Sequence, residues 1–148
     1  MSNKGSYPLE SASINAKNAV PIIDKQVQED LGGQWGETNS ADIGQDVNFR
    51  ITIHVHDGAQ DYILHDTMEE GFTFQENTVA VILRDGSSGV DSTITAAGNY
   101  TVETNGQTFK VIFFKDFCDS LNTNDRLIIT YTAMLNGKAE IGNGTAEN

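Results

Sequence analysis

The sequence predicts an all-β protein, an antiparallel β-sandwich of the immunoglobulin-like type. Short segments in which apolar and polar residues alternate recur along the 148 residues, and turn-forming residues separate them about every ten positions. No segment keeps a helical period, and strands do not alternate with helices as they would in a parallel sheet. Roughly eight short strands with this spacing are typical of a two-sheet sandwich.

The first strand is expected to begin near Val20. Residues 1–18 are rich in Ser, Asn, Ala and Gly, so we predict a flexible linker there and place the domain at 19–148. In the first strand, Ile23, Lys25 and Val27 share one face. A lysine on an apolar face is either paired and buried or lies at a sheet edge with its charged head in water. The strand pattern alone leaves both alternatives open.

Residues 28–46 are predicted to form a loop, because they combine several glycines with polar residues and one tryptophan, Trp35. The clearest strand follows at 46–56. Its odd-numbered residues are apolar and its even-numbered residues are polar, so one face belongs to the core and the other to solvent.

The strand at 62–66 directs a carboxylate into the core. Tyr62, Leu64 and Asp66 share one face, because side chains alternate along a strand. A buried charge without a partner is so unfavourable that the group binds a proton instead. Asp66 is therefore expected to have a cation beside it, or a raised pKa with a chemical use.

After a loop at 68–72, further strands are predicted at 77–84, 93–103, 107–114 and 126–135. Asn105-Gly106 is a strong hairpin signal, in which both central residues are expected to have positive φ. A polar connection at 116–124 contains Cys118. The core is predicted to include Phe49, Ile51, Ile53, Leu64, Phe109, Val111, Ile129 and Tyr131.

Composition excludes several functions. The formal charge of -12, with only nine Lys and Arg, argues against binding to nucleic acid or to an anionic membrane surface. A single cysteine, Cys118, cannot form an internal disulfide. No apolar run could insert into a membrane, and no signal-peptide pattern occurs, so we interpret the sequence as a mature or excised piece.

Five segments occur in an order that resembles a known family: PIIDKQVQED, ADIGQDVNFRITI, YILHDTMEEGFTF, RLIITYTAMLN and AEIGNGTAEN. Together they are similar to the fimbrial isopeptide-formation domain of Gram-positive surface proteins and pilin backbone subunits, the Cna-A-like sandwich. The resemblance covers about residues 20–148. It implies an extracellular location on a pilus or cell-wall-anchored surface protein, with neighbouring domains or pilin subunits as partners.

The resemblance also implies a covalent cross-link. In the family, a lysine on the first strand is joined to an asparagine near the start of the last strand, and a buried acid assists. Lys25 matches the lysine and Asp66 the acid. Spacing from Ile141-Gly142 places Asn148 at the asparagine position, with Asn143 as the alternative.

Two positions depart from the family pattern. The chain stops at Asn148, where the family continues with a strand, so the last strand is expected to be truncated. A peptide carrying that strand is then a candidate partner that would pair beside the first strand. Lys17 lies where related pilins carry the lysine used by sortase, but Asn15 and Ala16 replace the Tyr and Pro of that motif. A solvated linker lysine is the simpler interpretation.

The chemistry of the residues agrees with a cross-link. An amine attacks an amide only when it is neutral, and the amide carbonyl must be polarised. Protonated Asp66 would donate a hydrogen bond to that carbonyl and relay protons to the departing ammonia. The fold supplies proximity for a reaction that occurs once. The sequence thus predicts a structural domain with single-turnover autocatalysis, no conventional enzyme activity and no cofactor.

Two other functions are alternatives to the cross-linked structural domain. A metal enzyme would use His54, His56, His65 and Glu69, but strand histidines on a wet face are usually solvated. An adhesive module would bind a host protein or glycan through Trp35 and the acidic loops. A calcium site in those loops has no Asp-x-Asp-x-Asp-Gly motif to support it.

Overall fold

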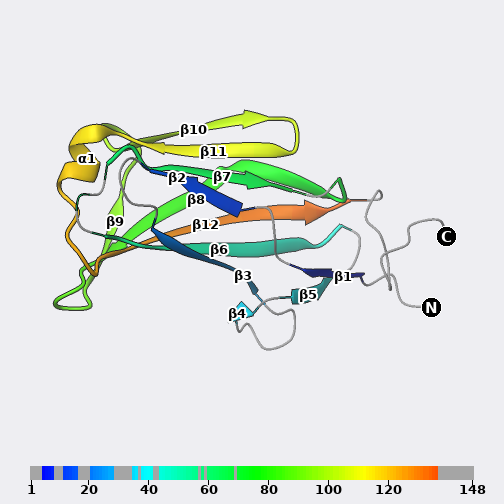
Figure 1. Cartoon of the computed structure of the whole chain (residues 1–148). Helices are drawn as coiled ribbons and strands as arrows, with labels where there is room; N and C mark the ends of the chain where they lie inside the picture. Colours follow the sequence, from blue (N-terminus) through cyan, green and yellow to red (C-terminus); the bar gives the residue numbers. More distant parts are fainter. Residues whose placement is uncertain are drawn as a thin grey trace.

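Two antiparallel sheets face each other in the computed structural model of the chain (Figure 1). The structure describes residues 5–8, 12–16, 21–28, 35–36, 38–41, 44–56, 58, 60–68 and 70–136. Among these, no helix is long and apolar enough to cross a membrane. The immunoglobulin-like sandwich predicted from the alternating strands is confirmed.

The larger sheet has the strand order β4-β3-β6-β12-β8-β9. Its strands are β3 (Ile22–Gln28), β4 (Trp35–Gly36), β6 (Asp46–His54), β8 (Phe72–Arg84), β9 (Asp91–Ile94) and β12 (Arg126–Leu135). The long strands β6 and β12 lie at its centre and pair along nine residues each. Strand β6 has the strict alternation that a half-buried strand requires, and β12 has it from Ile129 to Leu135.

The smaller sheet has the order β10-β11-β7-β2 and covers the larger one. Its strands are β2 (Ala12–Asn15), β7 (Ile63–Thr67), β10 (Tyr100–Asn105) and β11 (Thr108–Phe113). A separate pair consists of β1 (Gly5–Pro8) and β5 (Thr38–Ala41). All eight residues predicted for the core are at most 3% exposed.

The N-terminal region contains more structure than the sequence indicates. Residues 12–15, predicted as linker, form β2 and pair with β7, and Ile14 is buried in the core. Likewise β4 and β5 lie within the segment predicted as a loop. Strands of two to four residues are too short to show an alternation of their own, so pairing with a longer strand defines them.

Two predicted strands have different limits. Residues 93–103 are divided between β9 and β10, which belong to different sheets, and Gly98 with φ +77° lies in the connection. Strand β8 begins at Phe72, which was predicted to end a loop.

The predicted hairpin is confirmed, but its turn is displaced by one residue. Asn105 pairs with Thr108, so the central residues of the turn are Gly106 and Gln107. Only Gly106 has a positive φ, +63°. The expected positive φ at Asn105 is therefore wrong, because the register of β10 and β11 centres the turn one position later.

One helical turn, α1 (Lys115–Asp119), occupies the start of the polar connection predicted at 116–124. It buries Phe117 and Cys118 at one end of the sandwich (Figure 1). The ring of Phe117 stacks on that of Phe113 with centroids 5.8 Å apart. Five residues are too few to produce a recognisable helical period.

Candidate functional site: a buried lysine, aspartate and tyrosine

Lys25 and Asp66 meet between the two sheets. The Nζ atom of Lys25 donates a hydrogen bond to Oδ1 of Asp66 over 2.6 Å. The side chain of Lys25 is 9% exposed and that of Asp66 is fully buried. Asp66 therefore has the cation beside it that its inward position predicts, and of the two alternatives Lys25 is the paired and buried lysine.

Strand pairing fixes both partners. Lys25 lies opposite Ile51 of the central strand β6. Asp66 is paired on both sides, with Phe109 of β11 and with Ala12 of β2. Because each strand is held in register by its neighbours, the ammonium and the carboxylate face each other from rigid backbones.

Tyr131 is the third member of the site, and sequence reasoning placed it only in the core. Its hydroxyl donates to Oδ2 of Asp66 over 2.5 Å from the centre of β12. The ring is inward because of the alternation along β12, and a buried tyrosine hydroxyl normally has a hydrogen-bond partner. That requirement is a signal for a polar partner, although it does not say which residue provides it.

Aromatic rings surround the polar contact. Phe49 stacks on Tyr131 with centroids 5.3 Å apart and planes at 9°. Phe109 meets the same ring edge-on, with centroids 4.8 Å apart. Nζ of Lys25 lies 5.3 Å from the centroid of Phe49, within the range of a cation–π interaction. The polar contact is thus enclosed by apolar rings, where the effective dielectric constant is lower than in water.

Burial changes the ionisation of the site. It raises the pKa of Asp66, and this effect exceeds the opposing effects of the Lys25 charge and of the hydrogen bonds from Lys25 and Tyr131. Burial, together with the nearby Asp66 carboxylate, raises the pKa of Tyr131 well above its usual value. Burial therefore favours the neutral acid at Asp66, while Tyr131 stays a neutral donor.

Other residues named from the sequence lie outside the described residues: Lys17, Glu69, Asn143 and Asn148. Two of the histidines proposed as metal ligands are separated, because His54 belongs to β6 and His65 to β7 of the other sheet. Nε2 of His54 lies 3.0 Å from Oδ2 of Asp24. Within the described ranges, no three His, Cys, Asp or Glu residues are grouped as metal ligands.

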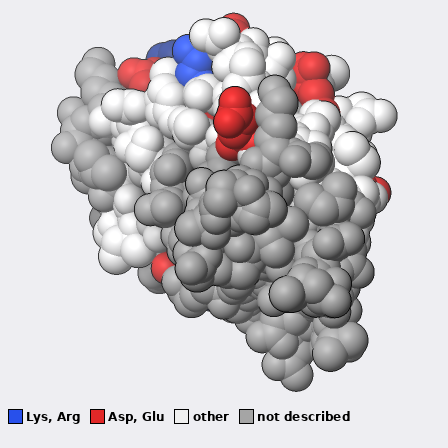
Figure 2. All heavy atoms as spheres, turned by 90° about the vertical axis from the view of Figure 1, so that its right-hand side faces the viewer, with Lys and Arg blue, Asp and Glu red and all other residues white. Residues whose placement is uncertain are grey.

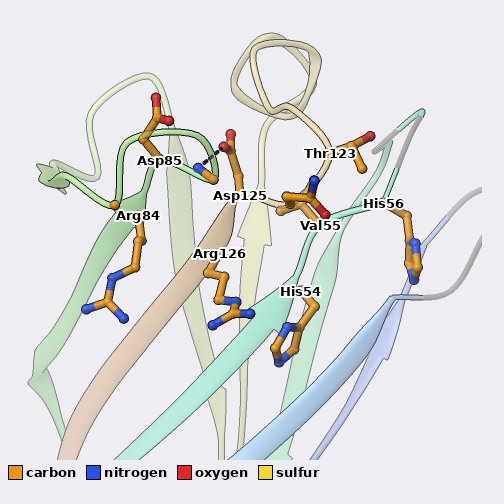
Figure 3. Close-up of a pocket in the computed structure, with 11 residues that line it drawn as sticks. His54, Val55, His56, Arg84, Asp85, Thr123, Asp125 and Arg126 are labelled. Carbon is orange, nitrogen blue, oxygen red and sulfur yellow. Dashed lines mark hydrogen bonds between the residues drawn. The ribbon is translucent and has the colours of Figure 1, made fainter.

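A shallow hollow of about 400 Å³ opens where β6, β8 and β12 meet (Figure 3). Arg84, Arg126 and His54 extend along it in the same direction, away from the carboxylate of Asp85. The carboxylate of Asp125 accepts hydrogen bonds from the backbone N–H groups of Gly86 and Asn122. Asp125 therefore ties two loops together.

The end of the sandwich toward which β12 runs is drawn in Figure 2. On its described surface, Asp and Glu side chains occur at several separate places, whereas Lys and Arg gather at one edge. This part of the surface lacks the broad basic patch that nucleic acid requires.

Solved structures of bacterial surface proteins are similar to this chain. The pilus backbone protein RrgB of Streptococcus pneumoniae is 26% identical with a TM-score of 0.60, over 82% of this chain and 47% of that one. Its full-length structure is 25% identical with a TM-score of 0.58, over 83% and 21%. The chain therefore spans about half, or less, of these RrgB structures.

The N-terminal domain of the Streptococcus gordonii adhesin Sgo0707 is 24% identical with a TM-score of 0.55, over 78% of this chain and 24% of that one. At this identity the likeness shows the fold alone. No protein-family model matches the sequence, and no curated protein matches it. The structural neighbours are consistent with a Cna-A-like pilin domain.

Proposed function

We propose that the chain is a structural domain of a Gram-positive pilus or cell-wall-anchored surface protein, and that it forms an isopeptide bond from Lys25 with assistance from Asp66. The observation that carries the proposal is the buried 2.6 Å contact between these residues, which come from opposite sheets. Likeness to a pilus backbone protein supports the structural role at the bacterial surface. Neighbouring domains or subunits of the same surface protein are its partners.

A purely stabilising role explains the pair poorly. Removing two charges from water is unfavourable, and well-packed apolar residues in place of a buried ion pair often give equal or greater stability. Lys25 and Asp66 lie among Phe49, Ile51 and Phe109, where apolar side chains would pack without that penalty. A reactive amine beside a carboxyl with a raised pKa instead suits acyl transfer.

The reaction begins with proton transfer from Nζ of Lys25 to Asp66. The neutral amine attacks the side-chain carbonyl carbon of an asparagine, while the acid hydrogen-bonds to the carbonyl oxygen. A C–N bond to Lys25 forms, the bond to the asparagine nitrogen breaks, and Asp66 passes the proton of the amine to that leaving group. One ammonia is released, with no oxidant or cofactor.

The asparagine is assigned by proposal to Asn148, with Asn143 as the alternative. An asparagine on an added last-strand peptide would meet the same chemical requirement, because the amine requires only a carbonyl held within reach.

The direct test is the intact mass of the denatured chain. The wild type is expected to weigh less than its sequence requires by one ammonia, and proteolysis should release a branched peptide containing Lys25. Lys25→Ala and Asp66→Asn should both keep the full mass, because the first lacks the amine and the second lacks the proton relay. Asn148→Ala and Asn143→Ala then identify the acyl donor.

Lys115→Ala is the matched control, because that side chain is 77% exposed and, within the part of the chain that the structure describes, it pairs with Asp119 on its own helix. It should lose ammonia as the wild type does. A wild-type chain of full mass that also forms no adduct with a last-strand peptide would contradict the proposal. Cross-linking that persists in Lys25→Ala would assign the bond to another lysine.

A further inference from the structure

The hydroxyl of Tyr131 donates a hydrogen bond to one of the two carboxylate oxygens of Asp66, Oδ2. We propose that Tyr131 is a positioning residue for the ligation: by donating to Oδ2, it makes Oδ1, the oxygen that faces Lys25, the one that accepts and delivers the proton. This inference rests on the proposed function.

The argument starts from the symmetry of a carboxyl group. A protonated carboxyl can carry its hydrogen on either oxygen, but only the oxygen next to the reacting groups is useful in proton transfer. Oδ1 lies 2.6 Å from Nζ of Lys25, whereas Oδ2 accepts the hydroxyl hydrogen of Tyr131. The proton that leaves Nζ arrives on Oδ1, and Oδ2 could carry it only if the Tyr131 hydroxyl turned its hydrogen away and became the acceptor.

The position of Tyr131 is fixed by packing. Its ring is stacked on Phe49 and meets Phe109 edge-on, so the hydroxyl oxygen cannot move away from Asp66 without disrupting both contacts. Among the described residues, Asp66 is the hydrogen-bond partner of this hydroxyl. The core therefore holds the hydroxyl oxygen beside Oδ2, and the acceptor at that position directs its hydrogen.

The surroundings of Asp66 contain few other groups that titrate. Lys25 of β3 contributes the charge that acts on it, and Tyr131 of β12 contributes the neutral donor. Its neighbours on β11 and β2, Phe109 and Ala12, are apolar. Loss of the Tyr131 hydroxyl would thus leave Oδ2 without its donor in an apolar environment.

This arrangement predicts a change in the pH profile of the reaction. The competent state is the pair that carries no net charge, so the rate falls at low pH, where the pair holds an extra proton. The hydrogen bond from Tyr131 stabilises the carboxylate and lowers the pKa of Asp66 against the effect of burial. Removing it raises that pKa, and the low-pH limb of the profile moves to higher pH.

The test compares the full-length wild type with Tyr131→Phe, which keeps the ring. Each chain is synthesised in a cell-free system, transferred to buffers from mildly acidic to mildly basic pH, and quenched at intervals for measurement of the intact mass. Tyr131→Phe is expected to lose ammonia on the order of tenfold more slowly, and its low-pH limb should lie at higher pH. Tyr100→Phe, which alters another buried tyrosine, should match the wild type.

Three results would overturn the inference. The first is an unchanged rate and profile in Tyr131→Phe. The second is a slower reaction of Tyr131→Phe whose low-pH limb stays in place, together with an equal slowing in Phe49→Leu. That result would assign the effect to packing. The third comes from NMR titration of the Asp66 carboxyl carbon in the unreactive Lys25→Met background, if adding Tyr131→Phe does not raise its midpoint. This titration needs no cross-link. It therefore tests the effect of the Tyr131 hydroxyl on the pKa of Asp66 even if the wild type never loses ammonia and the proposed function fails.

Discussion

Two opposing effects act on the pKa of Asp66. Burial favours the neutral acid, while the Lys25 charge and two donated hydrogen bonds favour the carboxylate. In the proposed reaction, Asp66 accepts a proton from Lys25 and returns it to the leaving group.

The same balance makes stability depend on pH when the cation is removed. In Lys25→Met, the folded pKa of Asp66 lies above its unfolded value, so the neutral acid is preferred in the folded state. The contribution of the protonated Asp66 to the free energy of unfolding is therefore fully present below the unfolded pKa. It is lost as pH rises through the folded pKa. We expect the free energy of unfolding to fall by up to about 1.4 kcal/mol per pH unit across that window.

Urea unfolding of Lys25→Met from about pH 4 to about pH 8 would measure this dependence. The control is Lys25→Met combined with Asp66→Asn, in which the titrating group is absent and this part of the slope should vanish. Equal slopes in the two variants would show that Asp66 ionises without difficulty in the folded protein.

Among the elements, β8 contains an irregularity directly opposite the site. Thr130 of β12 pairs with Ala80, but Thr132 pairs with Gln75, so residues 76–79 bulge out of the ladder beside Tyr131. The side chain of Thr78 replaces the missing backbone pairing: its Oγ1 accepts from Thr132 N–H over 2.8 Å and donates to the Gln75 carbonyl over 2.6 Å. One hydroxyl thus closes the bulge.

Thr78→Val should destabilise the fold by about 1–3 kcal/mol, because valine has a similar shape but leaves the Thr132 N–H and the Gln75 carbonyl without that partner. Thr130→Val, on the neighbouring strand, changes a threonine that makes no such bridge and should alter stability little. Chemical unfolding of both variants provides the comparison. A similar loss in both would mean that the bulge is held by its backbone alone.

Elements could be predicted from sequence where their own residues carry the pattern. Strand β12 has the predicted limits, Arg126–Leu135, because it is rich in β-branched and aromatic residues and alternates regularly from Ile129 to Leu135. Strand β2 was missed because four residues cannot show a period, and it exists through pairing with β7. The residues between β9 and β10 gave no indication that the chain passes from one sheet to the other, since both strands are individually regular.

The site, like the strands, could be predicted where the residues of a single strand carry the pattern. Strand alternation places Lys25 and Asp66 on inward faces, and the cost of burying a charge indicates that each needs a partner. The bond between Tyr131 and Asp66 depends on how the two sheets lie across from each other, which strand periodicity does not determine. The position of Tyr131 in the site is therefore set by the packing of the two sheets and does not follow from the pattern of any one strand.

For the whole molecule, the proposed bond would tie the first strand of the larger sheet to the end of the chain. If Asn148 is the acyl donor, it closes a loop of 148 - 25 = 123 residues. A cross-link of that span removes unfolded-state entropy worth about 5 kcal/mol in the loop-closure approximation. The reacted wild type should therefore unfold at a higher guanidinium concentration than Lys25→Met with Asp66→Asn, which lacks both the bond and the buried charges. Equal midpoints would contradict a stabilising cross-link.

Lys25 and Asp66 belong to opposite sheets, so the reactive pair exists only after the two layers have closed on each other. On the proposed chemistry, a chain that has closed even once has lost ammonia for good, whatever happens to it later. The mass of a fully denatured molecule then shows whether that molecule has ever folded and reacted. A mixed sample can be sorted by mass into chains that reached the native state and chains that never did.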